Sequence, residues 1–219
     1  MKIQFIGGVP APLVDALKRI GYQVVVNGPI QGVDIVHYYN CQVKPLPETA
    51  KRTALVKDVL PEGVDYSVWN PAVDQKIFRR YSPGTLSLKN LNKTAMQKEL
   101  GLSVEENTPL VGMISGEKVV GAGYQVIGPF TDEVLLHKLY AASDIVVVDS
   151  PSIASKYGAI TIDDLGSLKA TLAVFKADKP AWRRNQQQLM ALDFSWESVA
   201  KKYVSLYMKA LKRIGIAAL

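Results

Sequence analysis

The chain has 219 residues, which is enough for one substantial hydrophobic core or for two small ones. Hydrophobic residues make up 48% and charged residues 21%, a balance that excludes a largely disordered protein. The formal net charge of +6 suits an anionic partner, such as a nucleotide sugar, a nucleic acid or a membrane surface, without choosing among them.

Two further features bear on where the protein works. The single cysteine, Cys41, excludes an internal disulfide and fits a reducing compartment. The opening MKIQFIGG starts as a strand and not as a signal peptide, and no stretch of 18 apolar residues follows that could cross a membrane. We therefore expect a cytoplasmic protein without a membrane span, and peripheral contact with a membrane stays open.

The N-terminal part of the chain shows the pattern of a parallel sheet. Residues 2–6 predict a strand that ends at Gly7-Gly8, and residues 10–20 predict a helix because their apolar positions recur at helical spacing. Two more strands are expected, over residues 22–26 and 33–38. Strands and a helix joined by short connections indicate a parallel sheet, so residues 1–62 are predicted to form a reduced Rossmann-like lobe.

A segment rich in Pro, Gly, Asn and Ser, between residues 63 and 92, leads into a second lobe. Strands and helices then alternate again, which predicts a second α/β lobe over residues 63–194. The expected strands are residues 110–114, 125–127, 145–148 and 159–162, and the expected helices are residues 93–100, 131–142, 152–157, 165–176 and 180–191. Thr131 is the expected N-cap of its helix.

Several strings of residues resemble bacterial glycogen and starch synthases. They are GVDYSVWNPAVD at 63–74, YSPGTLSLKNLNKTAMQKELGL at 81–102, TPLVGMIS at 108–115, DEVLLHKLYAASDIVVVDS at 132–150 and AWRRNQQQLMALDFSWESVAKKYVSLY at 181–207. The resemblance implies an α/β protein of the GT-B type, with two Rossmann-like lobes that each hold a parallel sheet. It also implies that the C-terminal segment, residues 195–219, crosses back as a helix to pack on the first lobe. An apolar stripe along that segment supplies the packing surface: Val199, Tyr203, Leu206 and Ala210.

The chain departs from this family where the family carries its phosphate-binding and acidic residues. An arginine that follows the first strand of the family's second lobe has no counterpart, although Lys118 could stand in for a neighbouring lysine. The family's acidic loop is missing from the string SPSIASKYGAITIDD that starts at Ser150, and its N-terminal lysine motif is reduced to Gly7-Gly8-Val9. These losses weaken the inferred activity more than the inferred fold. A sheet needs only its strands, whereas glycosyl transfer needs charge placed against the departing diphosphate.

The resemblance and the ends of the strands together give the candidate site residues. His37, Lys118 and Asp149 are the candidate catalytic residues, with His37 alternatively a packed residue of its strand. The candidate substrate-binding residues are Gly7, Gly8, Ser150, Ser152 and Lys156. Backbone N–H groups of the glycines and the lysine ammonium suit a phosphate, although a glycine turn and an ordinary helix entry also explain these residues.

Other classes of site find less support. His137 lies on an amphipathic helix and is expected to face solvent. Neither histidine has a cysteine or a second histidine at metal-ligand spacing, so we expect no metal and no cofactor. Aromatic and basic residues do not interleave as in proteins that bind single-stranded nucleic acid, so we expect no nucleic-acid partner.

The sequence thus predicts a hexosyltransferase that moves a sugar from a nucleotide-activated donor to a carbohydrate or other acceptor in the cleft between two lobes. The alternative, favoured by the missing arginine and acidic loop, is a non-catalytic relative that serves as a carbohydrate-binding module, an interaction module or a minimised scaffold.

Overall fold

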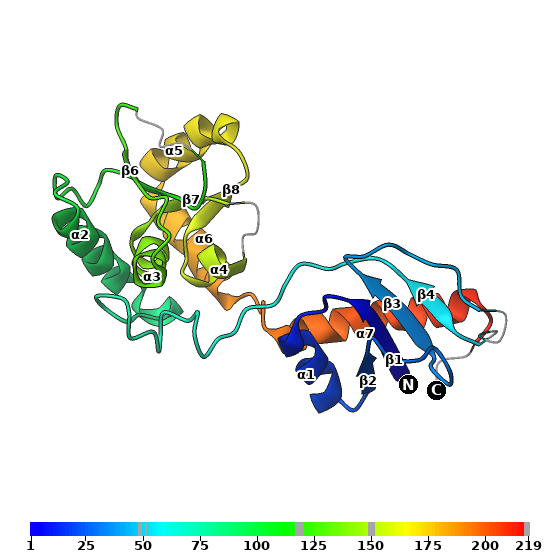
Figure 1. Ribbon diagram of the computed structural model, residues 1–219. Helices are drawn as coiled ribbons and strands as arrows, with labels where there is room; N and C mark the ends of the chain where they lie inside the picture. The colour runs from blue at the N-terminus through cyan, green and yellow to red at the C-terminus, as the bar shows by residue number, and fades with distance from the viewer. Residues whose placement is uncertain (48–49, 51, 117–120, 149–151, 217–219) are drawn as a thin grey trace. The chain divides into compact units, whose positions relative to one another are not determined.

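A computed structural model describes residues 1–216 of the protein except 48–49, 51, 117–120 and 149–151. The chain forms two compact units (Figure 1). Unit 1 combines the N-terminal residues Met1–Gly63 with the C-terminal residues Phe194–Leu219, and unit 2 is Val64–Asp193. Each unit contains one parallel sheet of four strands, which confirms the predicted α/β class.

Unit 1 is built on strands β1 (Lys2–Gly7), β2 (Gln23–Val26), β3 (Ile35–Tyr39) and β4 (Ala54–Val56). Their order is β2-β1-β3-β4, and all three pairings are parallel. The sequence analysis expected three strands here and missed β4, which has only three residues and no flanking pattern of its own.

Two helices cover one face of the unit 1 sheet: α1 (Ala11–Arg19) and α7 (Trp196–Arg213). Side chains alternate along a strand, so Ile3 and Phe5 of β1 point to the same face, where they pack with Leu17, Tyr203 and other buried residues. Helix α7 contacts both α1 and β4. The prediction that the C-terminal helix returns to the first lobe is therefore confirmed (Figure 1).

The start of α7 is fixed by its own residues. Ser195 is the N-cap, and its hydroxyl oxygen accepts a hydrogen bond from the N–H group of Ser198 at 3.2 Å. Lys212 and Arg213 lie in the last turn, where cations interact favourably with the helix dipole. The helix buries five residues at helical spacing: Val199, Ala200, Tyr203, Tyr207 and Leu211.

The other face of the unit 1 sheet carries a smaller apolar cluster. Val36 and Tyr38 of β3 belong to it, with Val33 and the partly buried Ile6 and Ile30. The connections from β2 to β3 and from β3 to β4 contain no helix among their described residues. Irregular chain segments therefore lie over this face.

Unit 2 is built on strands β5 (Leu110–Met113), β6 (Gln125–Ile127), β7 (Ile145–Val147) and β8 (Ile160–Ile162), in the order β6-β5-β7-β8 and all parallel. Its helices are α2 (Lys89–Glu99), α3 (Glu133–Ala142), α4 (Ser152–Lys156), α5 (Leu168–Ala177) and α6 (Lys179–Ala191), with 3-10 turns at Pro83–Leu88 and Leu165–Ser167. Helix α2 begins four residues before its predicted start. The N-cap of α3 is Asp132, whose carboxylate accepts the N–H of Leu135, and not the predicted Thr131.

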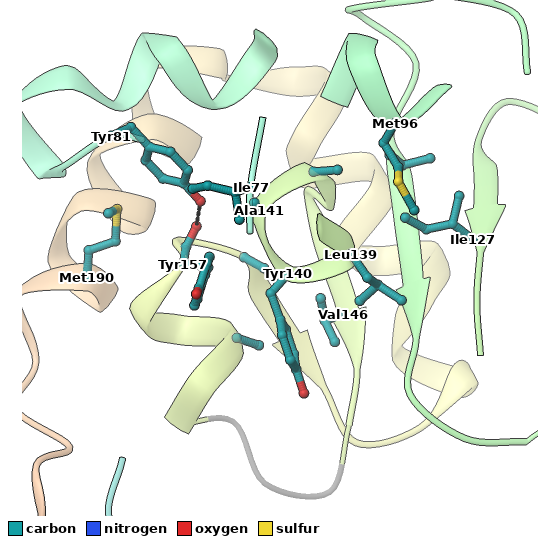
Figure 2. Packing of buried hydrophobic residues seen from close by; sticks show 14 of the residues in the cluster. Ile77, Tyr81, Met96, Ile127, Leu139, Tyr140, Ala141, Val146, Tyr157 and Met190 are labelled. Atoms are coloured by element: carbon teal, nitrogen blue, oxygen red, sulfur yellow. Dashed lines mark hydrogen bonds between the residues drawn. The ribbon is translucent and has the colours of Figure 1, made fainter. Parts of the chain in front are cut away.

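Apolar side chains cover both faces of the unit 2 sheet. Successive residues of β7 divide between two clusters, because Val146 packs with Leu139 and Tyr157 whereas Ile145 packs with Phe175 and Trp182. Figure 2 shows the first cluster, in which the Tyr81 hydroxyl donates a hydrogen bond to the carbonyl oxygen of Tyr157 at 2.7 Å. Burial on both faces is what a parallel sheet requires.

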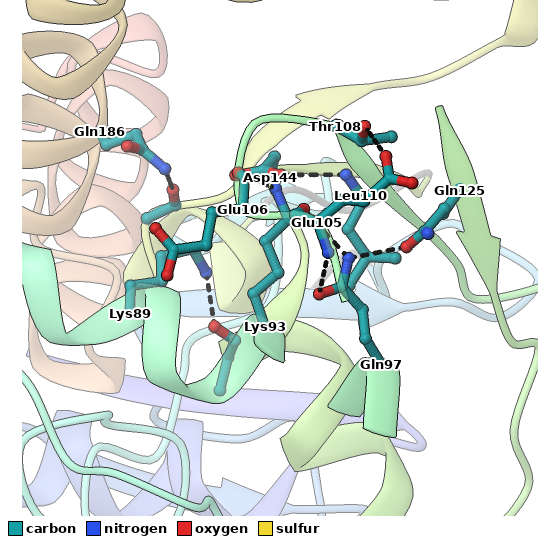
Figure 3. A network of polar contacts seen from close by, with 12 residues as sticks. Lys89, Lys93, Gln97, Glu105, Glu106, Thr108, Leu110, Gln125, Asp144 and Gln186 are labelled. Atoms are coloured by element: carbon teal, nitrogen blue, oxygen red, sulfur yellow. Dashed lines mark hydrogen bonds and ion pairs between the residues drawn. The ribbon is translucent and has the colours of Figure 1, made fainter. Parts of the chain in front are cut away.

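Two lysines of α2 are buried inside unit 2 (Figure 3). The ammonium group of Lys89 donates to the carbonyl oxygens of Tyr140 at 3.0 Å and Ala141 at 2.9 Å, at the end of α3, where helix carbonyls lack partners within the helix. Burial lowers the pKa of Lys89 to about 7. Lys93 forms an ion pair of 2.7 Å with Asp144, whose carboxylate also accepts the N–H of Leu110.

Candidate functional site

The strand order of unit 2 defines a switch point between β5 and β7. The chain leaves β5 for β6 on one side and returns through α3 to β7 on the other side. In open parallel sheets, ligands bind outside the carboxyl ends of the strands at such a point. Met113 pairs with Val147 at the carboxyl ends of the two strands, so the loops that follow β5 and β7 leave the sheet side by side.

Three of the predicted site residues belong to these two loops. Lys118 follows β5, and Asp149 and Ser150 follow β7, but all three lie outside the described residues. Ser152 is the first residue of α4. The grouping of these residues into one site, and their individual roles, stay predictions.

Lys156 ends α4 and packs inside unit 2. Its ammonium group lies 4.2 Å from the centre of the Tyr66 ring and 3.4 Å from the carbonyl oxygen of Met190. Partial burial lowers the pKa of Lys156, while the nearby Asp193 acts in the opposite direction. The lysine is therefore held by an aromatic ring and a backbone carbonyl in this structure, and a phosphate would have to compete with both.

Unit 1 repeats the same topology, with its switch point between β1 and β3. Gly7 ends β1 in a left-handed conformation, with φ of 108°. Its N–H group donates to the side-chain oxygen of Asn27 at 3.0 Å, so that donor is already used. Gly8 is exposed, and no atom lies within 4 Å of where a Cβ would be. Of the two predicted phosphate-binding glycines, Gly8 is the one with open space beside it.

His37 lies completely buried on the helix-covered face of the unit 1 sheet. Its Nδ1 atom is 2.9 Å from the hydroxyl of Tyr207 on α7, and the rings of Phe5, Tyr39 and Tyr203 surround it. Burial lowers the pKa of His37 to about 4, against a smaller opposite effect of Asp58. These are the contacts of a packed neutral histidine, which is the alternative that the sequence left open.

His137 does not face solvent, and the prediction that it does was wrong. The side chain is fully buried, with Nδ1 at 2.7 Å from the carboxylate of Asp74 and the ring of Trp69 stacked on it at 3.9 Å between ring centres. Tyr157 donates a short hydrogen bond to the same carboxylate. This buried group links the segment around Asp74 to α3 and to Tyr157, the residue that follows α4. The helical pattern around His137 gave no sign of it.

Both units have hollows at their surfaces, and among the described residues one on each unit is considered for binding. The hollow of unit 1 has a volume of about 490 Å³ and lies at the carboxyl ends of β1 and β3. One hollow of unit 2 has about 520 Å³ and is lined by Asp74, Gln75, Ile77, Phe78, Arg79, Arg80 and Leu88. Another, of about 360 Å³, lies along α6 and is lined by Lys179, Pro180, Arg183, Arg184 and Gln187. The sequence analysis singled out neither the residues around Arg79 and Arg80 nor the apolar residues of the unit 1 hollow as candidates.

No family model matches the chain. Among curated proteins, the glycogen synthase of Geotalea daltonii is 26% identical in an alignment that covers 92% of this chain and 60% of that protein. The glycogen synthase of Clostridium kluyveri is 28% identical over 68% of this chain and 48% of that protein. This chain is a distant relative of the bacterial glycogen synthases.

This confirms the resemblance that the sequence analysis found. The chain spans about 60% or less of the length of these curated glycogen synthases. Among solved structures, the catalytic domain of starch synthase IV from Arabidopsis thaliana, bound to ADP and acarbose, matches with a TM-score of 0.57 and 22% identity. The match covers 84% of this chain and 57% of the starch synthase domain, and it confirms the GT-B-like fold. Among the described residues of this chain, no helix is both long enough and apolar enough to cross a membrane.

Proposed function

We propose that the protein is a GT-B glycosyltransferase that moves a sugar from a nucleotide-activated donor, bound mainly by unit 2, to a hydroxyl group of an acceptor. One observation supports this most directly. The chain is a relative of glycogen synthases, and its strands β5 and β7 are paired. The segment that leads to Lys118 and the segment that leads to Asp149 and Ser150 therefore start next to each other, at the switch point of the sheet.

The chemistry requires charge opposite the departing diphosphate. The bond from the sugar to the diphosphate oxygen breaks, a bond from the sugar to the acceptor oxygen forms, and the acceptor's hydroxyl proton passes to the departing diphosphate. In this proposal the ammonium of Lys118 balances the negative charge that builds up on the diphosphate. In the same proposal the carboxylate of Asp149 accepts hydrogen bonds from sugar or ribose hydroxyls, and the hydroxyls of Ser150 and Ser152 donate to oxygen atoms of the nucleotide sugar. Lys156 approaches the phosphates once it leaves Tyr66.

The shortened chain gives a specific reason to keep the second candidate. The chain lacks the family's arginine and acidic loop and spans at most about 60% of the relatives' length. A protein that keeps the scaffold without these groups would serve as a carbohydrate-binding module, an interaction module or a minimised scaffold. The same experiment separates the two functions.

The test is a panel of nucleoside diphosphates and their sugars, screened by thermal unfolding and then by turnover. A donor present at about 100 times its Kd would stabilise the protein by roughly 2.7 kcal/mol, which raises Tm by about 5 °C or more. Lys118→Ala should abolish this shift and the turnover, while Lys98→Ala, an exposed lysine at the end of α2, should change neither. Absence of any shift or turnover would refute the proposal, and glucan binding without turnover would favour the non-catalytic module.

A further inference from the structure

The hollow of unit 1 lies on the face of the sheet that no described helix covers. Ile6 and Tyr38 pair across β1 and β3 and both belong to the apolar cluster of this face. Ile30 lines the hollow from the connection between β2 and β3, and Cys41, Lys44 and Pro45 line it from the connection between β3 and β4.

An uncovered parallel sheet explains why the hollow is apolar. In doubly wound folds, helices cover both faces of a parallel sheet, and the strands are correspondingly hydrophobic. Here α1 and α7 pack on one face, and irregular segments border Ile6 and Tyr38 on the other. Apolar side chains that a helix would otherwise bury therefore line the hollow. Its volume of about 490 Å³ is in the range that small ligands occupy.

The position of the hollow points to a ligand. Gly7 and Tyr38 are among its lining residues, and both lie at the carboxyl ends of β1 and β3, next to the switch point of this sheet. Ligands of open α/β sheets bind in this place. Gln42 and Lys44 bring polar groups to the lining, but the rest of it favours an apolar body over a sugar chain, because sugar hydroxyls placed against Ile6, Ile30 and Pro45 would lose hydrogen bonds to water.

The charge of the unit favours an anionic group on that ligand. Unit 1 contains 12 Lys and Arg against 6 Asp and Glu, whereas unit 2 contains 14 of each. The whole net charge of +6 therefore belongs to unit 1. Lys44 brings one of these cations into the lining of the hollow, where it would attract an anion that approaches the apolar surface.

We propose that the hollow of unit 1 binds a small molecule with an apolar body, one anionic group near Lys44 and a free hydroxyl, and that such a molecule is the acceptor. The second half rests on the proposed function, and the binding site itself does not. The acceptor class then differs from the glucan that the names of the relatives suggest.

Two matched fluorescent probes test the site. 1-Anilinonaphthalene-8-sulfonate has an apolar aromatic body and one sulfonate, and N-phenyl-1-naphthylamine has the same body without the charge. Both should bind the wild-type protein and fluoresce. Lys44→Ala should weaken binding of the sulfonate probe about threefold to fivefold and leave the neutral probe unchanged, because only the charge interaction is lost.

A second pair of variants tests the place of binding. Ile30→Glu puts a carboxylate into the apolar lining and should weaken both probes at least about tenfold. Val43→Glu is the control, since Val43 is 41% exposed in the same connection as Lys44 but does not line the hollow. The inference is overturned if both probes bind Ile30→Glu as tightly as the wild type, or if Val43→Glu weakens them equally.

The single cysteine supplies a readout that does not depend on the folding of a variant. Cys41 is exposed and lines the hollow, so either probe should slow its alkylation by iodoacetamide in the wild-type protein. An unchanged rate at saturating probe would overturn the inference. Probe binding without transfer from any sugar nucleotide would refute the proposed function alone, and transfer to glucans with no probe bound would refute only this inference.

Discussion

The Nδ1 atom of His37 lies 2.9 Å from the hydroxyl oxygen of Tyr207, and the two residues are 170 positions apart in the chain. His37 belongs to β3 near the N-terminus, and Tyr207 belongs to α7 near the C-terminus. The contact shows that a helix from the end of the chain supplies part of the core of unit 1. Since the ring is buried among aromatic side chains, it also makes the stability of this unit depend on pH.

Acidification should destabilise unit 1 between about pH 6.5 and pH 4. The pKa of His37 is lowered from 6.5 to about 4 in the folded state, so within this window the unfolded chain binds a proton that the folded chain does not. Stability is complete above pH 6.5 and falls by up to about 3 kcal/mol as pH decreases through the window. Hydrogen exchange of β3 and α7 amides at pH 7 and pH 5 measures this loss. His37→Phe should flatten the dependence, and an unchanged pH profile in that variant would contradict the assignment.

Removal of α7 should unfold unit 1 and spare unit 2. A chain that ends at Asp193 loses Tyr203, Tyr207 and Leu211, which are buried against the unit 1 sheet, whereas the residues of unit 2 are complete. The remaining part of unit 1 has about 60 residues and one helix among those that the structure describes, too little to offset its chain entropy. Hydrogen exchange should show lost protection in β1 and β3 and retained protection in β5 and β7.

A single substitution in α7 should lower the stability of unit 1 without unfolding it. Leu211→Ala should cost about 2–4 kcal/mol in the unfolding free energy of unit 1, because it leaves a cavity under the helix. Lys209→Ala, an exposed position on the same helix, should cost less than about 0.5 kcal/mol. Equal effects of the two substitutions would contradict the packing described here.

The sequence predicted the parts of the fold that local patterns encode. The apolar run of β1 followed by Gly7 and a helical repeat identified a parallel unit, and the stripe along α7 identified a helix that needs a surface. Strand β4 was missed because Ala54–Val56 is too short to show a period and pairs only at the sheet edge.

The polar residues were harder to predict, because their partners come from distant parts of the chain. His137 has its partner Asp74 63 positions away, and Lys93 has Asp144 51 positions away. A charged residue on a helix normally indicates a solvated face. Only the folded chain shows that Lys93 is buried with an oppositely charged group, and the site residues Lys118 and Asp149 depend on the family resemblance alone.

Breaking the Lys93–Asp144 pair should strongly destabilise unit 2. Lys93→Met leaves the buried carboxylate of Asp144 without a counter-charge, at a cost of about 3–5 kcal/mol in the free energy of unfolding. Adding Asp144→Asn removes that charge and keeps an oxygen to accept the N–H of Leu110, so the double variant should recover at least half of the loss. Urea unfolding measures both. Glu99→Gln, which breaks the more exposed pair with Lys138, is the control and should cost less than about 1 kcal/mol.

The two glycines that follow β1 should differ sharply when each is replaced by alanine. A Cβ at Gly7 would lie 2.3 Å from the carbonyl oxygen of Tyr39 and 2.9 Å from the Sγ of Cys41, and the φ of 108° is strained for any residue with a side chain. Gly7→Ala should therefore lower the unfolding free energy of unit 1 by about 2 kcal/mol or more.

Gly8→Ala should leave stability within about 0.5 kcal/mol of the wild type, because nothing lies within 4 Å of the added Cβ. Urea unfolding of unit 1, followed by hydrogen exchange in β1, compares the two variants. The Gly8→Ala variant also tests anion binding at this turn independently of stability. If a phosphate or another anion approaches this turn, Gly8→Ala should weaken its binding in a protein of unchanged stability, since the added methyl group occupies the open space beside the backbone. Equal stability of the two variants would show that the close approach of Gly7 to Tyr39 and Cys41 does not constrain the turn.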